Sequence, residues 1–224
     1  MATIHRLHPD NPQARTIAQI VDALRDGAIM LYPTDTVFAI GCDLMSKSAV
    51  ESVRKLKQMS NDKPLTFLCS SLSNIAEYAN VSNANYRTMK SLVPGPFTFI
   101  LPATKLVPKL VLNPKRKTTG IRVPNHMVSQ ALIEALGNPV ISTSANLQED
   151  ALDNLKLDYQ GKGSKQRHVS TLSKIELFDY FYKLVDLIVD DGSDLSYEVS
   201  TIVDLTDDLN PQILRQGLGE VPFL

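Results

Sequence analysis

Several short segments of the sequence place hydroxyl, amide and guanidinium side chains directly beside apolar runs. These segments are Tyr32–Gly41, Pro94–Thr98, Gly120–Pro124, Val140–Asn146, Ser200–Asp204 and Ile213–Gly217. Hydroxyls and amides are neutral donors and acceptors, and the arginine fork matches carboxylate and phosphate oxygens. Side chains of these types suit a site that binds phosphate, ribose or an amino acid.

The first segment contains a polar turn, Pro33-Thr34-Asp35-Thr36, between two apolar runs. A loop at the carboxyl end of a strand in an α/β sheet is where ligands commonly bind. The alternative is a tight turn in which threonine and aspartate bond to their own backbone. The pattern alone leaves both interpretations open.

Two later segments carry further candidate ligand-binding groups. An apolar strand at Val140 opens into Ser142-Thr143-Ser144 and then Asn146, which predicts either ligand contacts or a helix N-cap. Arg122 stands inside an apolar strand, so it must be paired, and we expect a ligand carboxylate or phosphate as its partner. The turn at Pro94 is rigid and leads into Thr98.

Residues for several other chemistries are missing or badly spaced. The four histidines, His5, His8, His126 and His168, have no zinc-ligand spacing, so we expect no metal bound by the protein. We expect Cys42 and Cys69 to be small core residues rather than nucleophiles. What remains suits a reaction governed by positioning and charge neutralisation, and nucleotidyl transfer to a carboxylate or carbamate is one.

The elements that must position these groups alternate between helix and strand, which predicts an α/β fold with a mixed, mostly parallel sheet. Ile17, Ile20, Val21 and Leu24 mark the buried face of a first helix, capped by Asn11 and closed by Gly27. Further helices are expected at Leu72–Ala79, Ala84–Leu92, Met127–Leu136 and Ile175–Leu184, and one after Ser46. Strands are expected at Ala28–Tyr32, Val37–Ile40, Lys63–Cys69, Phe97–Leu101, Gly120–Val123, Val140–Thr143, Asp186–Val189, Thr201–Leu205 and Gln212–Arg215.

The chain shows no convincing linker, so we predict one domain over residues 1–224. Residues 148–173 have little apolar periodicity, and we interpret them as a long loop or insertion near a site. Hydrophobic residues make up 43% of the 224 positions and the net charge is −1, which excludes a largely disordered chain. No apolar run reaches the roughly 18 residues of a membrane helix, and we expect a cytoplasmic protein.

Charge is unevenly distributed along the sequence. Residues 105–122 contain six basic residues and no acid, and residues 185–214 contain eight acids and no base. One interpretation is two solvated surfaces of opposite sign that touch one another. The other is that the basic segment faces an anion such as a nucleotide phosphate or RNA.

The ordered set of polar segments resembles the YrdC/YciO family. The family pattern contains a PTDT loop, K-x-R, P-G-P-x-T, G-x-R-x-P, S-x-S-A-N, S-T-I-V-D and I-x-R-x-G, and the likeness covers roughly residues 15–147 and 185–219. The opening His8–Pro12 and Lys115–Thr118 are most similar to the YciO branch. The resemblance implies a twisted α/β sheet of the YrdC-like or DHBP synthase-like kind, with a large, positively lined concave cleft.

The best-known members of this family make threonylcarbamoyl-adenylate from L-threonine, bicarbonate and ATP, which feeds N6-threonylcarbamoyladenosine formation on tRNA, and some members bind double-stranded RNA. The resemblance implies Lys57 and Arg215 as catalytic residues that neutralise ATP phosphates, with Mg²⁺ entering as part of the ATP substrate. It implies a threonine or carbamate site formed by Thr34, Thr36, Arg122, Ser142 and Ser200. It implies nucleotide contacts from Lys57, Thr98, Ser144, Asn146 and Arg215.

Two departures from the family pattern bear on the chemistry of the site, and Phe38 also stands where the family often has tyrosine. Met59 replaces the arginine of K-x-R. Leu68 replaces a histidine that the family commonly has after its next motif, N-P-L or K-P-L, which is Lys63-Pro64-Leu65 in this sequence. Two alternatives remain beside the synthase, the first motivated by Met59 and Leu68 and the second by the basic residues of 105–122. One is a YciO-type enzyme with a different substrate, or one that hydrolyses a threonylcarbamoyl group. The other is a tRNA- or double-stranded-RNA-binding module without catalysis. The oligomeric state, monomer or homodimer, is also open.

Overall fold

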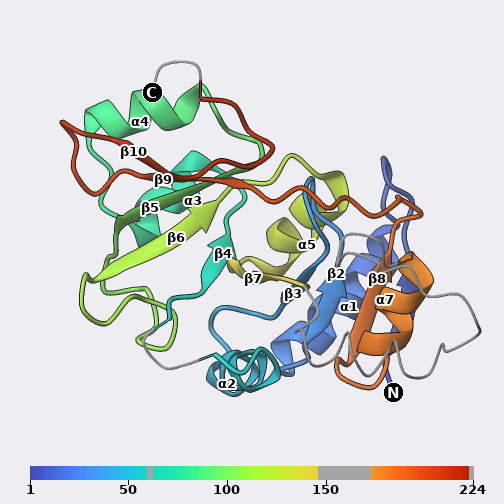
Figure 1. Cartoon of the computed structure of the whole chain (residues 1–224). Helices are drawn as coiled ribbons and strands as arrows, with labels where there is room; N and C mark the ends of the chain where they lie inside the picture. The colour runs from blue at the N-terminus through green and yellow to red at the C-terminus, as the bar shows by residue number, and fades with distance from the viewer. Residues whose placement is uncertain (60–62, 146–172, 222–224) are drawn as a thin grey trace, which may run out of the picture.

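A computed structural model describes residues 1–59, 63–145 and 173–221 of the chain (Figure 1). Within these residues ten strands form one sheet, in the order β1-β8-β2-β3-β7-β4-β6-β5-β9-β10. The strands are β1 (Thr3–Arg6), β2 (Met30–Tyr32), β3 (Ala39–Gly41), β4 (Thr66–Leu68), β5 (Phe97–Pro102), β6 (Thr118–Arg122), β7 (Val140–Ser144), β8 (Leu187–Asp190), β9 (Thr201–Asp204) and β10 (Gln212–Arg215). The helices are α1 (Ala14–Arg25), α2 (Lys47–Leu56), α3 (Leu72–Tyr78), α4 (Asn83–Lys90), α5 (Met127–Leu136) and α7 (Lys174–Phe181).

The sheet is mixed, as predicted. Strands β1 and β2 pair with β8 in parallel, and so do β4 with β6 and β5 with β9. The remaining neighbours, β2–β3, β3–β7, β4–β7, β5–β6 and β9–β10, pair antiparallel. Parallel pairing is therefore not the majority among the described strands, because β3 and β7 run against both of their neighbours.

Alternation of side chains along each strand divides the core into two layers. Met30 and Tyr32 pack with α1 and α5 on one face of the sheet, whereas Leu31 belongs to the core on the other face. The second face carries the residues of α2, α3, α4 and α7 (Figure 1). In this second layer the fully buried ring of Phe67, on β4, packs edge-on against the ring of Tyr78. The two ring centroids lie 5.6 Å apart.

The face covered by α1 and α5 changes character further along the sheet. Pairing places Thr66 of β4 opposite both Gly120 of β6 and Ser142 of β7, and it places Thr98 beside Ile202. A Cβ atom added to Gly120 would lie 2.9 Å from Thr66 Oγ1. Small and polar side chains on adjacent strands thus leave a hollow on this part of the face. The other part, under α1 and α5, buries large aliphatic side chains instead.

Several element boundaries differ from the sequence-based expectation. Helix α1 begins at Ala14 with Gln13 as its N-cap, so the prediction of Asn11 as the cap was wrong. The reason is a local turn, since His8 Nδ1 accepts hydrogen bonds from the backbone N–H groups of Asp10 and Asn11. Helix α5 occupies the predicted Met127–Leu136, followed by Gly137 with φ +75°.

Strand β1 was not predicted; it is a mostly exposed edge strand held by parallel pairing to β8. The predicted loop 148–173 lies almost entirely outside the described residues, and its last residue, Ser173, is the N-cap of α7 in a capping box with Glu176. No helix in the described part of the chain is long and apolar enough to cross a membrane.

Replacing the central core residue Phe67 by alanine tests the importance of the second layer. We expect Phe67→Ala to lower the free energy of unfolding by roughly 3–5 kcal/mol, because the ring leaves a cavity between β4 and α3. Ile175→Ala is the control, since Ile175 is 73% exposed. Urea unfolding measures both, and equal losses in the two variants would contradict the packing described above.

Candidate functional site

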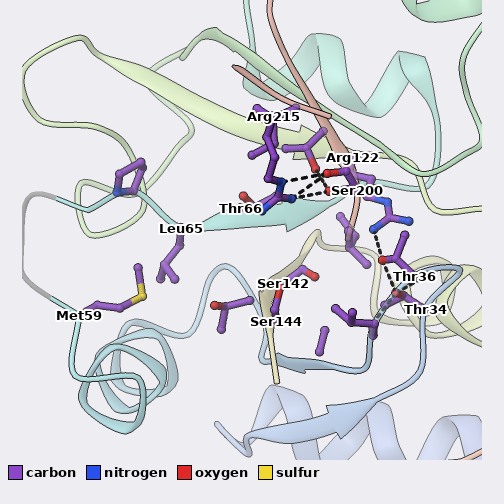
Figure 2. Close-up of a pocket in the computed structure, with 17 residues that line it drawn as sticks. Thr34, Thr36, Met59, Leu65, Thr66, Arg122, Ser142, Ser144, Ser200 and Arg215 are labelled. Carbon is purple, nitrogen blue, oxygen red and sulfur yellow. Dashed lines mark hydrogen bonds between the residues drawn. The ribbon is translucent and has the colours of Figure 1, made fainter. Parts of the chain in front are cut away.

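A cavity of about 150 Å³ lies on the polar part of the sheet (Figure 2). It is lined by eight of the predicted site residues: Thr34, Thr36, Thr98, Arg122, Ser142, Ser144, Ser200 and Arg215. These residues come from β5, β6, β7 and β10, from the turn between β2 and β3, and from the residue before β9. The side chains singled out in the sequence therefore converge on one concave site.

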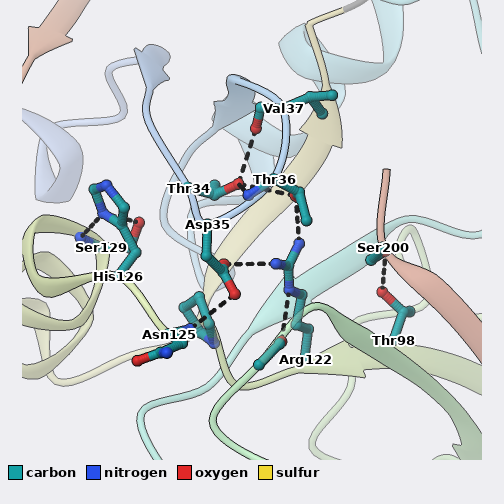
Figure 3. A network of polar contacts seen from close by, with 12 residues as sticks. Thr34, Asp35, Thr36, Val37, Thr98, Arg122, Asn125, His126, Ser129 and Ser200 are labelled. Atoms are coloured by element: carbon teal, nitrogen blue, oxygen red, sulfur yellow. Dashed lines mark hydrogen bonds and ion pairs between the residues drawn. The ribbon is translucent and has the colours of Figure 1, made fainter. Parts of the chain in front are cut away.

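Arg122 is the most completely enclosed cation of the cavity (Figure 3), with its side chain 6% exposed. It donates from Nη2 to Asp35 Oδ1 at 2.5 Å and from Nη1 to Thr36 Oγ1 at 2.7 Å. Its Nε donates to the carbonyl of Gly95 at 3.3 Å. Asp35 is thus an internal partner of Arg122 that the sequence analysis did not identify, and the expected ligand carboxylate or phosphate stays a prediction.

The turn beside Arg122 forms a directed chain of hydrogen bonds. Thr34 Oγ1 donates to the carbonyl of Val37 at 2.8 Å and accepts from the backbone N–H of Thr36 at 3.1 Å. Since the single hydroxyl proton of Thr34 is used in this way, Thr36 is the donor in the 3.1 Å contact between the two hydroxyls. The turn therefore combines both sequence interpretations, since its self-bonded residues also line the cavity.

Arg215 lines the cavity next to Ser200 (Figure 2). Its Nε and Nη2 donate to the carbonyl of Ser200 at 3.2 and 2.8 Å, and Ser200 Oγ lies 2.9 Å from Thr98 Oγ1. Burial, together with the nearby charge of Arg122, lowers the pKa of Arg215. Among the described residues, no carboxylate lies within ion-pair distance of Arg215, in contrast to Arg122.

Lys57 lies at the end of α2 and reaches the rim of the cavity through its ammonium group. Its Nζ donates to the backbone carbonyl of Ser144 at 3.0 Å, and burial lowers the pKa of Lys57. The side chain is not among those that line the cavity, whereas Met59, two residues later, is. Asn146, predicted to contact nucleotide, lies outside the described residues.

Sequence reasoning missed some of the cavity wall. Thr66 lines the cavity, as do Pro64 and Leu65, and none of the three was a predicted site residue. Thr66 was included only in a predicted strand, and its threonine type in an apolar run was the available signal. Cys42 and Cys69 are fully buried free thiols, as predicted, and burial raises the pKa of each, that of Cys42 to about 12.

A second polar cluster holds the start of α5 next to the turn. His126 accepts the Ser129 N–H on Nδ1, and its Nε2 lies 3.0 Å from Asp191 Oδ2. Burial alone would raise the pKa of Asp191, but hydrogen bonds from His126 and Ser193 outweigh it and lower the pKa to about 2. In the described part of the chain, no group of three or more His, Cys, Asp or Glu is arranged to hold a metal ion.

Comparison with known proteins identifies the family of the chain. Residues 22–156 match the Sua5/YciO/YrdC family model, whose description is "Telomere recombination". The chain belongs to this family. It is 40% identical to the uncharacterised protein YciO of Escherichia coli K12 over the full length of both chains. The crystal structure of E. coli YciO superposes with a TM-score of 0.83 over 99% of this chain and 98% of that one.

Two relatives carry a named activity or ligand. The threonylcarbamoyl-AMP synthase of E. coli O1:K1 is 36% identical over 141 residues, which are 62% of this chain and 74% of the synthase. The crystal structure of Pyrococcus abyssi Sua5 in complex with L-threonine, at 25% identity, has a TM-score of 0.77 and covers 96% of this chain and 58% of Sua5. The family membership expected from the polar segments is thereby confirmed.

Acid titration tests the Asp191 cluster. Because the folded-state pKa of Asp191 is depressed from 3.8 to about 2, its stabilisation is present above about pH 4 and is lost as the pH falls toward 2. We expect the free energy of unfolding of the wild type to fall, on acidification, by roughly 1–2 kcal/mol more than that of Asp191→Asn. Urea unfolding between about pH 2 and pH 6 measures it, with the exposed Asp194→Asn as control. An unchanged pH profile in Asp191→Asn would refute the assignment.

Proposed function

We propose that this protein is a threonylcarbamoyl-AMP synthase-like nucleotidyltransferase. It would transfer AMP from ATP to N-carboxy-threonine, and its product would feed tRNA N6-threonylcarbamoyladenosine modification. The observation that carries the proposal is the convergence of eight hydroxyl and guanidinium side chains, from distant segments, on one cavity. The 36% identity to a threonylcarbamoyl-AMP synthase supports the choice of reaction.

The amino-acid end of the cavity is assigned to the side of Arg122. Thr34, Thr36 and Arg122 offer hydroxyls and a guanidinium within one hydrogen-bonded unit, and Ser142 and Ser200 complete the wall. A neutralised arginine can still bind a carboxylate through N–H groups that its internal partners do not use. The relative Sua5 was crystallised in complex with L-threonine, which supports an amino acid as one of the ligands.

The nucleotide end is assigned to the side of Arg215. Arg215 is a cation without a neighbouring carboxylate among the described residues, which favours a phosphate-bearing ligand there. Thr98 and Ser144 line the same cavity, and Lys57 stands at its rim. Mg²⁺ would enter with ATP as part of the substrate, since Mg²⁺ usually binds through substrate phosphates and few protein ligands.

The proposed reaction has two steps, carboxylation of the amine and transfer of AMP. The threonine amine adds to bicarbonate to give the N-carboxylate, with loss of one water. A carboxylate oxygen then attacks the α-phosphorus of ATP in line, the bond to the β-phosphate oxygen breaks, and pyrophosphate leaves. Negative charge develops on the phosphate oxygens in this step, so Lys57 and Arg215 would act by positioning and charge neutralisation.

Threonine-dependent release of pyrophosphate tests the proposal. We expect Arg215→Ala to lower the rate by about 100-fold or more, because a preorganised cation at the phosphates is lost. Arg116→Ala is the control, since Arg116 pairs with Asp204 and does not line the cavity. Wild-type protein that releases no more pyrophosphate than Arg215→Ala would overturn the synthase assignment.

A related enzyme with a different substrate is the alternative that the cavity itself motivates. Met59 and Leu68, which replace polar residues of the family pattern, both line the cavity and make part of its wall apolar. If thermal unfolding shows stabilisation by ATP but none by threonine, the changed-substrate enzyme is favoured over the synthase. Hydrolysis of a threonylcarbamoyl group belongs to the same alternative.

RNA binding is a second candidate function, favoured by the connection between β5 and β6. Lys105, Lys109, Lys115 and Lys117 are exposed there and lie outside the cavity. Arg116 of the same connection contacts Asp204 at 2.9 Å, so the basic and acidic segments do touch. A tRNA or duplex RNA could bind this surface through its phosphates.

Lysine substitutions in this connection test RNA binding. We expect tRNA binding to weaken steeply with rising salt, and Lys105→Ala with Lys109→Ala to reduce the salt slope by about one to two. The exposed pair Lys90→Ala with Lys183→Ala is the matched control. Filter binding at several salt concentrations measures the slopes. The absence of tRNA binding at low salt would remove this candidate.

A further inference from the structure

Asp35 stands behind the cavity wall rather than on it. Its side chain is 12% exposed, and it is not among the residues that line the cavity. Its Oδ1 accepts from Arg122 Nη2 at 2.5 Å, and its Oδ2 accepts from the backbone N–H of Asn125 at 3.0 Å (Figure 3). A carboxylate in this place can act on a ligand only through the residues that it holds.

The hydrogen-bond inventory of Arg122 shows what Asp35 leaves available. A guanidinium carries five N–H groups, and three of them donate to Gly95, Thr36 and Asp35. The other two, one on each terminal nitrogen, have no acceptor among the described residues. Because Arg122 lines the cavity, these two donors are the N–H groups that remain for a carboxylate bound there.

The turn that carries Asp35 is itself fixed to the start of α5. Ser129 Oγ donates to the carbonyl of Pro33 at 2.7 Å, and Asn125 donates to Asp35 from the segment just before α5. Arg122 and Asn125 are three residues apart, so Asp35 bridges the end of β6 and the entry to α5. This bridge leaves the guanidinium little freedom to rotate away from Thr36.

We propose that Asp35 is a positioning residue that holds Arg122 in place to bind the carboxylate of an amino-acid substrate. The inference rests on the proposed function for the identity of that substrate, L-threonine. Asp35 also cancels the charge of Arg122, so this end of the cavity recognises a single carboxylate by directed N–H groups. Without Asp35 the guanidinium keeps its charge but is oriented only by its contacts with Thr36 and the Gly95 carbonyl.

A matched carboxylate exists elsewhere in the chain. Asp204 Oδ2 accepts from Arg116 Nη2 at 2.9 Å, and its Oδ1 accepts from the backbone N–H of Thr206 at 3.0 Å. Asp204 thus makes the same two kinds of contact as Asp35, to an arginine and to a backbone amide. Arg116 does not line the cavity, so Asp204→Ala controls for the general loss of an arginine–carboxylate pair.

Calorimetric titration of the full-length protein with L-threonine, and separately with Mg²⁺-ATP, tests the proposal. For Asp35→Ala we expect the Kd for L-threonine to rise at least about tenfold, because the carboxylate-binding N–H groups are no longer held in register. We expect the Kd for Mg²⁺-ATP to stay within about twofold, since the nucleotide end is built from other residues. Asp204→Ala should leave both constants within about twofold.

Asp35→Asn keeps the shape of the side chain and one acceptor for Arg122, and its Kd for L-threonine should fall between those of wild type and Asp35→Ala. If Asp35→Ala does not fold, Asp35→Asn decides alone, and a Kd equal to that of wild type overturns the proposal. Equal weakening of L-threonine binding and Mg²⁺-ATP binding in Asp35→Ala also overturns it, because that is the result of general damage.

Wild-type protein that does not bind L-threonine overturns the proposed function as well, whereas wild-type binding with unaffected Asp35 variants overturns only this inference.

Discussion

The buried pair of Arg122 and Asp35 is the interaction on which the cavity depends. An arginine with a 6% exposed side chain cannot remain in the sheet without a partner, and removing the partner of a buried charge typically costs about 3–5 kcal/mol. The pair joins β6 to the turn between β2 and β3, which lie on different parts of the sheet. It therefore fixes the turn threonines relative to the strands that form the floor of the cavity.

The floor itself follows from the pairing of short strands. Side chains alternate between the two faces, so residues paired across β7, β4 and β6 point to the same side. On that side Ser142, Thr66 and Gly120 form a row of small residues, and a side chain at Gly120 would meet Thr66 Oγ1 at 2.9 Å. The opposite face of the same strands carries Ile141, Phe67 and Ile121 in the core. One set of strands thus provides both a packed core and an open polar surface.

The sequence predicted those parts of the structure that depend on local pattern. The helix Met127–Leu136 was predicted to the residue, because apolar periodicity and a glycine stop act within one segment. The partner of Arg122 could not be read in the same way, because Asp35 is 87 residues away and many anions would satisfy an arginine. Strand β1 was missed for a related reason: it is stabilised by pairing to β8, about 180 residues later, and not by its own apolar pattern. The convergence of the polar segments on one site was predicted from their order along the chain. That order matches the family pattern, and no single segment indicates it.

The two arginines of the cavity divide its charge unequally, and this bears on how a ligand would be oriented. Arg122 is neutralised by Asp35, whereas Arg215 donates only to the carbonyl and hydroxyl of Ser200 among the described residues. The proximity of the two guanidiniums contributes to the lowered pKa of Arg215, so an anion at Arg215 relieves repulsion as well as gaining a partner. The denser negative charge of a ligand is therefore favoured at Arg215, and a single carboxylate at Arg122. The proposed substrate pair, a nucleoside triphosphate and an amino acid, would fit this polarity in one orientation, with the phosphates beside β10 and the amino acid beside the turn.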